Sequence, residues 1–395
     1  MRYVYGLTLA VLLLAGCASS SAPKVDDQVE CQAIFDAGST GTRLWIYYKD
    51  GDAWKGKEIK KTSALANPMT RTVDHEAATE AVKVLEQFKK TMKNSKCDSI
   101  SSIRVLATAG MRLAEKHDDT SSKFWQKLFD ALSVKNKNVT VATRTITGYE
   151  EGIYAWLAAR NKRETKKLST DDFGLAELGG ASVQVAFPCG KSCPDGRVVK
   201  VAGKKIKIFN HSFLNLGTNE ASQALGYPDL PDSCKHAAGK NKGWKKETCR
   251  DLISDKLVKR DGKIWDPTPK TFIKIQDRSH VGKWSFAGSF AYMDSGNNKN
   301  VQDCCIDGLK DERSCYKWEN SCFVAIYRPV LLEALQIDHT DNKNVYKSAT
   351  NWTLGALICE ETNCLPKRAP DECLWLTDSK CLAPPKKNET QKAKK

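Results

Sequence analysis

The sequence predicts an α/β protein made of two similar domains that face each other across a cleft. The chain has 395 residues, a length that suits two to three domains. Short apolar runs typical of strands alternate with segments of helical spacing. A strand–loop–strand pattern with an acidic residue at the end of its first strand occurs twice, around Asp36 and around Glu177. Such an internal repeat indicates a duplicated architecture.

The first half of the chain contains the first copy of this pattern. Residues 33–35 predict a strand, 36–42 a loop and 43–48 a second strand. Later segments are predicted by their apolar spacing as follows: a helix over 75–92, a buried strand over 103–107, a helix over 122–132, a strand over 139–142 and a helix over 150–160.

The second half repeats the pattern and then changes in composition. Residues 173–176 predict a strand, 177–182 a loop and 183–187 a strand. Residues 190–270 are rich in Lys and Gly with few long apolar runs, which indicates an elaborated surface region. A helix is predicted over 324–335. Residues 384–395 are basic and polar, so we expect a disordered tail there.

The N-terminus predicts export. An uncharged stretch with an apolar centre follows Arg2, and it is too short to span about 30 Å of hydrocarbon as a helix. We therefore expect a signal peptide over residues 1–16. The segment 14–17, Leu-Ala-Gly-Cys, looks like a bacterial lipobox, which predicts a lipid on Cys17 and a tether over 17–30. The protein would then be anchored in a bacterial cell envelope, facing the periplasm or the surface; a plain signal peptide and secretion are the alternative.

The cysteines agree with an oxidising compartment. The chain has 15 Cys, and setting Cys17 aside leaves an even number, which favours disulfides over metal binding. Short-range pairs Cys189–Cys193, Cys234–Cys249 and Cys373–Cys381 are plausible, although spacing alone does not fix the connectivity. We expect every one of these cysteines to be paired.

Composition and charge exclude some classes of protein but do not identify a function. The 41% hydrophobic and 28% charged residues exclude wholesale disorder and a multi-pass membrane protein. The net charge of +15 permits attraction to nucleic acid, anionic lipid or phosphorylated small molecules, and does not choose between them.

The repeated loops suggest phosphate chemistry. Backbone N–H groups of a Gly-rich turn can converge on an anion, and hydroxyls in the first loop add donors. The acidic residues at the strand ends, Asp36 and Glu177, would repel phosphate, so their expected partner is a divalent cation or its waters. A tight hairpin turn is the simpler explanation for either loop alone. Two loops of like design favour a site that grips adjacent phosphates.

A third segment could supply a base. Glu150 and Glu151 stand at a predicted helix start, where carboxylates interact well with the helix dipole without any catalytic role. A hydrolase, however, needs a group to deprotonate the attacking water, and one of this pair could serve. The chain has no GxxxxGK[ST] loop, GxSxG elbow or HExxH pair.

Together these residues resemble the nucleoside triphosphate diphosphohydrolase (apyrase) family. The segments that carry the resemblance stand in the family's order and span about residues 31–357: 36–43, 107–113, 146–152 and 177–184, which are similar to the first four apyrase motifs, and then 211–217, 322–327 and 351–356. Each motif is modest, but the ordered set is specific.

The resemblance implies an actin/hexokinase-like (ribonuclease H-like) fold, two α/β domains with the active site in the cleft between them. Domain I would comprise residues 31–160 plus about 350–383, and domain II residues 161–349. By the resemblance, Glu151 is the base, Glu150 supports it, and Ser182 and Gln184 position the water. The residues expected to bind phosphate are Gly38, Ser39, Thr40, Gly41, Thr42, Thr108, Ala109, Arg112, Gly179, Gly180 and Ala181.

Other roles implied by the resemblance concern the metal and the nucleobase. Asp36 and Glu177 would hold Ca²⁺ or Mg²⁺ mostly through water, although the family usually has Asp where this chain has Glu177. Tyr327 is a candidate for stacking on the base, with an ordinary core tyrosine as the alternative. His211 and Trp352 are assigned to packing.

These expectations predict an exported apyrase that hydrolyses the terminal phosphate of nucleoside tri- and diphosphates by metal-assisted attack of base-activated water. The residues do not choose between triphosphates and diphosphates, between bases, or between Ca²⁺ and Mg²⁺. The alternatives are an exopolyphosphatase-type enzyme, whose family has similar motifs, and an inactive surface adhesin on the same fold. We expect a monomer that contacts the membrane through the lipid on Cys17 and has no nucleic-acid partner.

Overall fold

The computed structural model describes residues 28–366 apart from 68, 163–164, 170–171, 191–192, 236–243, 259–262, 269, 294–304, 306–319, 342 and 348–350. The predicted signal peptide, Cys17, the Cys373–Cys381 pair and the basic tail therefore lie outside the described residues. No helix within the described part of the chain has the length and apolar character needed to cross a bilayer.

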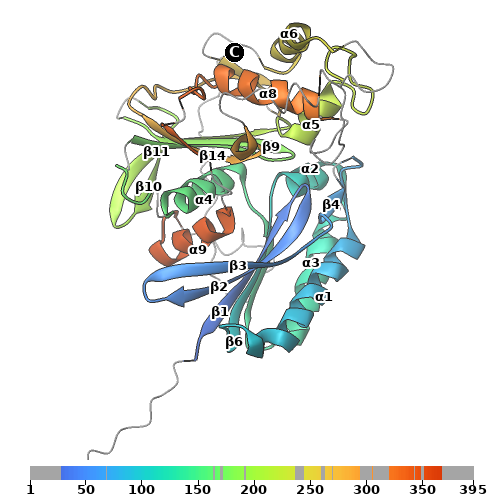
Figure 1. Ribbon diagram of the computed structural model, residues 1–395. Helices are drawn as coiled ribbons and strands as arrows, with labels where there is room; N and C mark the ends of the chain where they lie inside the picture. The colour runs from blue at the N-terminus through green and yellow to red at the C-terminus, as the bar shows by residue number, and fades with distance from the viewer. Residues whose placement is uncertain are drawn as a thin grey trace, which may run out of the picture.

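A first lobe is built on a five-stranded sheet with the order β3-β2-β1-β6-β7. Helices α1 and α3 cover one face of this sheet, where their apolar side chains form a core with those of β1, β2 and β6 (Figure 1). The elements of this lobe are β1 (Glu30–Gly38), β2 (Gly41–Asp50), β3 (Ala53–Thr62), β4 (Ala66–Asn67), β5 (Thr72–Val73), α1 (His75–Thr91), η1 (Met92–Asn94), β6 (Ser99–Ala107), α2 (Ala109–His117), α3 (Ser121–Lys135) and β7 (Thr140–Thr145).

A second lobe is built on a six-stranded sheet with the order β10-β11-β9-β8-β14-β15. Helices α5, α6 and α8 lie on its outer side (Figure 1). The elements of this lobe are β8 (Phe173–Leu178), β9 (Ser182–Pro188), β10 (Arg197–Val201), β11 (Lys204–Leu214), α5 (Thr218–Ala224), α6 (Lys246–Lys256), β12 (Lys263–Asp266), β13 (Thr271–Lys274), β14 (Lys283–Gly288), η3 (Ser289–Tyr292), α8 (Ser321–Ala334) and β15 (Val345–Lys347).

The two sheets share one topology. β1 is antiparallel to β2 and parallel to β6, and β8 is likewise antiparallel to β9 and parallel to β14. The two acidic residues occupy equivalent places, because Asp36 pairs with Arg43 across the first hairpin and Glu177 pairs with Gln184 across the second. The predicted α/β duplication is confirmed, and this order agrees with the predicted actin/hexokinase-like class.

Two helices form a layer between the sheets. α4 (Gly148–Arg160) and α9 (Trp352–Thr362) pack against each other, and their apolar side chains join those from the inner faces of both sheets in one core (Figure 1). A Cβ atom at Gly355 would lie 1.7 Å from the carbonyl oxygen of Tyr154, so glycine permits this close approach. Because α4 and α9 each contact strands of a sheet, the predicted domain boundaries at 160 and 350 stay predictions.

The structure differs from the sequence prediction in two segments. The loop predicted over 36–42 is a two-residue turn, since β1 continues to Gly38 and β2 starts at Gly41. Residues 190–270 are not only a surface elaboration, because β11 lies inside the second sheet and Ile253 is fully buried. The exposed start of β11 contains several lysines. The sequence therefore has the composition of a surface segment there, and it does not indicate an interior strand.

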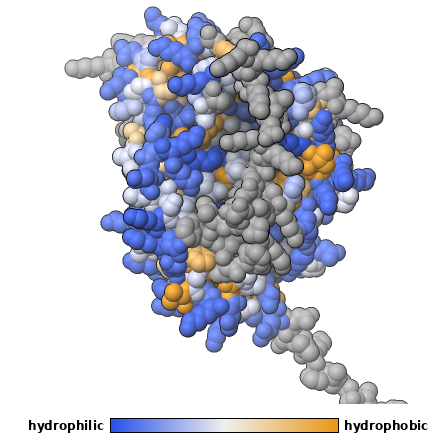
Figure 2. All heavy atoms as spheres, turned by 180° about the vertical axis from the view of Figure 1, so that it is seen from behind, coloured by the Kyte–Doolittle hydropathy of each residue, from blue (hydrophilic) through white to orange (hydrophobic). Residues whose placement is uncertain are grey.

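Five disulfides join described cysteines. They link Cys31–Cys97, Cys189–Cys193, Cys234–Cys249, Cys305–Cys322 and Cys359–Cys364. Two of the short-range pairs predicted from the sequence are thus confirmed. The coloured part of the face in Figure 2 is mostly hydrophilic, with hydrophobic residues in small separate groups.

Candidate active site

The first phosphate loop is the β1–β2 turn, residues 38–42. Gly41 has a φ of +145°, and a Cβ there would lie 2.8 Å from the carbonyl oxygen of Thr62, so this position requires glycine. Helix α2 starts beside the loop. The Thr108 N–H donates to the carbonyl of Ala37 at 3.1 Å, and a Cβ at Gly110 would lie 3.1 Å from the Ser39 Cα. The predicted segments 38–42 and 108–112 therefore lie together.

The second phosphate loop, residues 179–181, meets the first. A Cβ at Gly180 would lie 2.5 Å from Ser39 Oγ and 2.8 Å from Thr40 Cγ2, which places loops from the two lobes in direct contact. The first turn of α5 holds this loop from behind, because Asn219 N–H donates to the Gly180 carbonyl at 2.8 Å. The sequence prediction that both loops serve one site agrees with this arrangement.

Three carboxylates gather at the same place. Burial raises the pKa of Asp36 to about 6; Arg43 opposes the rise, and the Glu151 carboxylate adds to it. Burial also raises the pKa of Glu177 well above its usual value, with further contributions from Glu151 and Asp36. Each carboxylate thus lies within electrostatic range of another. Asp36 Oδ1 accepts a hydrogen bond from the Trp352 indole at 3.1 Å.

The two adjacent glutamates have different surroundings. Glu150 is fully buried, forms an ion pair with Arg144 at 2.9 Å, and completes a capping box with Thr147 at the start of α4. Glu151 points Oε2 at Arg112, whose Nη2 lies 2.8 Å away, and among the described residues no group bonds to Oε1. Burial raises the pKa of Glu151, and Arg112 counters this rise. Glu150 is therefore committed to structure, whereas Glu151 keeps an oxygen for a ligand.

A chain of polar side chains continues from Glu151 into the second lobe. Arg112 Nη2 also lies 3.3 Å from Ser182 Oγ, and Gln184 Nε2 donates to Ser182 Oγ at 2.6 Å. Ser212 extends this chain, since its Oγ accepts from Gln184 Nε2 at 3.1 Å. Glu151, Ser182 and Gln184, which the sequence predicted to act on water, are thus brought together. The guanidinium of Arg112, predicted to bind phosphate, here holds the candidate base.

Sequence reasoning missed two of these contacts. Trp352 was assigned to packing, yet its indole N–H holds Asp36. Ser212 received no role, although it follows His211 within a motif quoted for the family. His211 itself bonds to Asp266, with 2.7 Å between Nε2 and Oδ2. Tyr327 is fully buried and donates its hydroxyl to the Leu216 carbonyl at 2.6 Å, so no ring face is available for a base and the core alternative fits.

The donor set suits a hard divalent cation. Glu177 Oε2 is buried and has no hydrogen-bond partner in the described part of the chain, and it lies near two further carboxylates. A cation or its waters would give Glu177 Oε2 a partner and would reduce the repulsion between the three carboxylates. Ca²⁺ and Mg²⁺ both prefer oxygen ligands. Among the described residues, no three acidic, His or Cys side chains stand close enough to coordinate one ion directly. Asp36 and Glu177 therefore fit a role in holding a hydrated ion.

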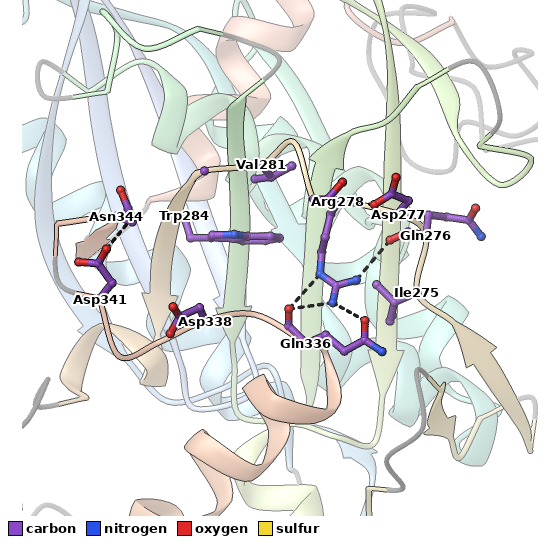
Figure 3. Close-up of a pocket in the computed structure, with 12 residues that line it drawn as sticks. Ile275, Gln276, Asp277, Arg278, Val281, Trp284, Gln336, Asp338, Asp341 and Asn344 are labelled. Carbon is purple, nitrogen blue, oxygen red and sulfur yellow. Dashed lines mark hydrogen bonds between the residues drawn. The ribbon is translucent and has the colours of Figure 1, made fainter.

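A separate cavity lies away from these residues. It has a volume of about 440 Å³ and is lined at the start of β14 by Trp284, whereas Glu177 lies near the opposite end of the adjacent parallel strand β8 (Figure 3). Arg278 donates within the cavity to the carbonyl and the side-chain oxygen of Gln336 (Figure 3). We therefore do not place the phosphate site there.

Comparison with known proteins identifies the family. Residues 24–329 match the model of the GDA1/CD39 (nucleoside phosphatase) family. The chain belongs to this family. The chain is also similar to Probable apyrase 4 of Arabidopsis thaliana, with 30% identity over an alignment of 223 residues that covers 52% of this chain and 42% of the relative. Ectonucleoside triphosphate diphosphohydrolase 1 of Mus musculus is 26% identical over 238 residues, or 54% of this chain and 46% of the relative.

The matched part covers less than half of these nucleoside phosphatase relatives. For the Nucleoside-triphosphatase of Pisum sativum, 30% identical over 211 residues, the shares are 48% of this chain and 46% of the relative. A crystal structure of nucleoside triphosphate hydrolases from Neospora caninum has a TM-score of 0.53 at 14% identity, covering 84% of this chain and 92% of that one. At this identity the likeness concerns the fold alone, and it agrees with the mixed α/β architecture of this chain.

Proposed function

We propose that the protein is an apyrase that hydrolyses the terminal phosphate of nucleoside tri- and diphosphates. One observation carries the proposal: two loops from equivalent sheet positions meet beside a buried glutamate whose Oε1 has no partner among the described residues. Membership of the nucleoside phosphatase family supports a phosphorylated nucleoside as the substrate.

Glu151 is the general base of the proposed reaction. A water molecule near Oε1 would give its proton to Glu151 as it attacks the terminal phosphorus, and the leaving nucleotide would carry the released negative charge. The raised pKa of Glu151 makes the carboxylate a stronger base than an exposed glutamate. Arg112 fixes the orientation of this carboxylate, and Ser182 and Gln184 provide polar groups that orient the water.

The two loops bind the phosphates. Residues 38–42 and 179–181 lie against each other where the lobes meet, and the hydroxyls of Ser39, Thr40 and Thr42 would add donors to their backbone N–H groups. The Thr42 Oγ1 is buried without a hydrogen-bond partner in the described structure, so a ligand would satisfy it. Asp36 and Glu177 would hold the waters of Ca²⁺ or Mg²⁺, and the ion would neutralise charge on the phosphates.

Release of phosphate from a panel of nucleotides tests this function. Wild-type protein should release phosphate from ATP and ADP with added Mg²⁺ or Ca²⁺ and none with EDTA. Glu151→Gln should lower kcat by about 10²–10⁴ and change KM little, because it removes a positioned base. Faster release from long polyphosphate than from ATP would replace the proposal with an exopolyphosphatase. No release from any nucleoside phosphate would favour a binding protein.

We also propose that the protein is exported and anchored through a lipid on Cys17. The apolar N-terminal segment and the five described disulfides support this location, since disulfides persist in oxidising compartments. Metabolic labelling with a fatty acid should mark wild-type protein and leave Cys17→Ser unlabelled. Equal labelling of both proteins would refute the anchor.

A further inference from the structure

An ion pair outside the carboxylate cluster joins the two lobes. Arg71, in the turn between β4 and β5, places Nη2 2.9 Å from Oε2 of Glu220 on α5. The Glu220 side chain is only 2% exposed, whereas that of Arg71 is 34% exposed. A second contact joins the same two elements, with 3.0 Å between Gln223 Nε2 on α5 and Met69 Sδ in the β4–β5 turn. The β4–β5 hairpin of the first lobe is thus fastened to α5 of the second.

The Glu220 end of this pair is connected to the second phosphate loop. The first turn of α5 donates three backbone hydrogen bonds to that loop, from Thr218 to the Gly179 carbonyl at 2.9 Å and from Asn219 and Glu220 to the Gly180 carbonyl at 2.8 and 3.3 Å. A displacement of Glu220 would therefore be transmitted directly to the loop.

The Arg71 end is connected to the first phosphate loop. The backbone N–H of Val73, in the same hairpin, donates to Asp118 Oδ2 at 2.9 Å, and Asp118 ends helix α2. Arg71 itself lies 3.3 Å from Nε2 of His117, the last residue of α2. The other end of α2 lies against Ser39. The hairpin and α2 thus link Arg71 to the loop through rigid secondary structure.

We propose that Arg71 and Glu220 are positioning residues, which fix the separation of the two phosphate loops and so the geometry of the catalytic cleft. The inference rests on the proposed function and specifies how that site is held. A half-buried ion pair adds little net stability, because the desolvation cost of Glu220 offsets the attraction, so we assign the pair a geometric role. A pocket of about 460 Å³ lined by both residues opens beside the pair and gives solvent access to Arg71.

Hydrogen exchange and kinetics on matched variants test the proposal. Arg71→Met breaks the pair at its more exposed end, Glu220→Met removes both acceptor oxygens while keeping the length of the side chain, and Arg71→Lys keeps the charge. Arg250→Met is the control, because Arg250 pairs with Glu333 between α6 and α8 within the second lobe. In protein without nucleotide, amide exchange in residues 179–182 should rise about fivefold or more in the two breaking variants and stay unchanged in the control.

The kinetic result separates positioning from general stability. With ATP, kcat/KM should fall about tenfold in Arg71→Met, because a misplacement of about 1 Å can cost up to about 10²-fold, and Arg71→Lys should recover most of the loss. Unchanged exchange in residues 179–182 or an unchanged kcat/KM would overturn the proposal. A wild-type protein without phosphohydrolase activity would refute the proposed function alone, since the exchange measurement would still decide whether the pair holds the loops.

Discussion

Replacing Asp36 by Asn is expected to stabilise the metal-free protein at neutral pH. Burial raises the pKa of Asp36 from 3.8 to about 6. Above pH 6 the carboxylate is charged in both the folded and the unfolded chain, so folding carries the full free-energy cost of the difference between the two pKa values. At 1.36 kcal/mol for each pKa unit the cost is about 3 kcal/mol. An Asn side chain removes the charge and keeps Oδ1 as an acceptor for the Trp352 indole.

The pH dependence of this gain has a definite sign. Between pH 3.8 and 6 the folded chain binds more protons at Asp36 than the unfolded chain does, so the contribution of Asp36 to stability falls as pH rises. Below pH 3.8 the group is protonated in both states. The advantage of Asp36→Asn should therefore be largest above pH 6 and shrink toward zero in acid.

Urea unfolding followed by tryptophan fluorescence measures this difference in oxidised protein with EDTA. Asp36→Asn should exceed wild type by up to about 3 kcal/mol at pH 8 and by much less at pH 4, whereas the exposed control Asp119→Asn should change stability little. Ca²⁺ at about 100 times its Kd should then stabilise wild type by about 2.7 kcal/mol and the variant by less. A variant less stable than wild type at pH 8 would refute the reasoning.

Three further predictions concern neighbouring features. Glu177→Asp should keep activity and change the ratio of Mg²⁺- to Ca²⁺-supported rates, whereas Glu177→Ala should lose activity with both ions. Phosphate release across a titration of each metal measures both effects. Full activity in Glu177→Ala would remove this residue from the site. Glu150→Gln should lower the free energy of unfolding by about 3–5 kcal/mol, since it removes the carboxylate that neutralises the buried Arg144, and in kinetic assays it should reduce kcat less than Glu151→Gln does. Replacing Cys31 and Cys97 by Ser should cost about 4 kcal/mol in urea unfolding, because their disulfide closes a separation of 66 residues; a loss below 1 kcal/mol would contradict this estimate.

The sequence alone predicted the duplicated α/β fold because its signals are local. Helical apolar spacing marked α1, α3 and α8 close to their observed bounds, and the two acidic hairpins marked the repeat, although the strand predicted over 33–35 extends over 30–38. The grouping of Glu151, Ser182 and Gln184 followed from the ordered motifs.

Contacts between distant segments could not be predicted in this way. The bond from Trp352 to Asp36 joins residues 316 positions apart, and only the packing of α9 between the sheets creates it. The pairing of Arg112 with Glu151 depends in the same way on the approach of α2 to α4. Spacing within one segment contains no information about such pairs. The burial of Tyr327 also depends on the assembled core. An aromatic residue in an apolar helix has the same sequence pattern whether its side chain faces a cavity or packs against a neighbour.

The late position of α9 in the chain means that one support of Asp36 is synthesised last among the residues around it. The two loops and Glu151 are synthesised well before residue 352, yet until that residue joins the fold Asp36 lacks its indole donor and the core between the sheets lacks the side chains of α9. A nascent or C-terminally clipped chain would therefore lack one support of the proposed active site. For a chain that crosses a membrane before it folds, as the proposed export would require, such an order of assembly would keep the proposed activity low inside the producing cell.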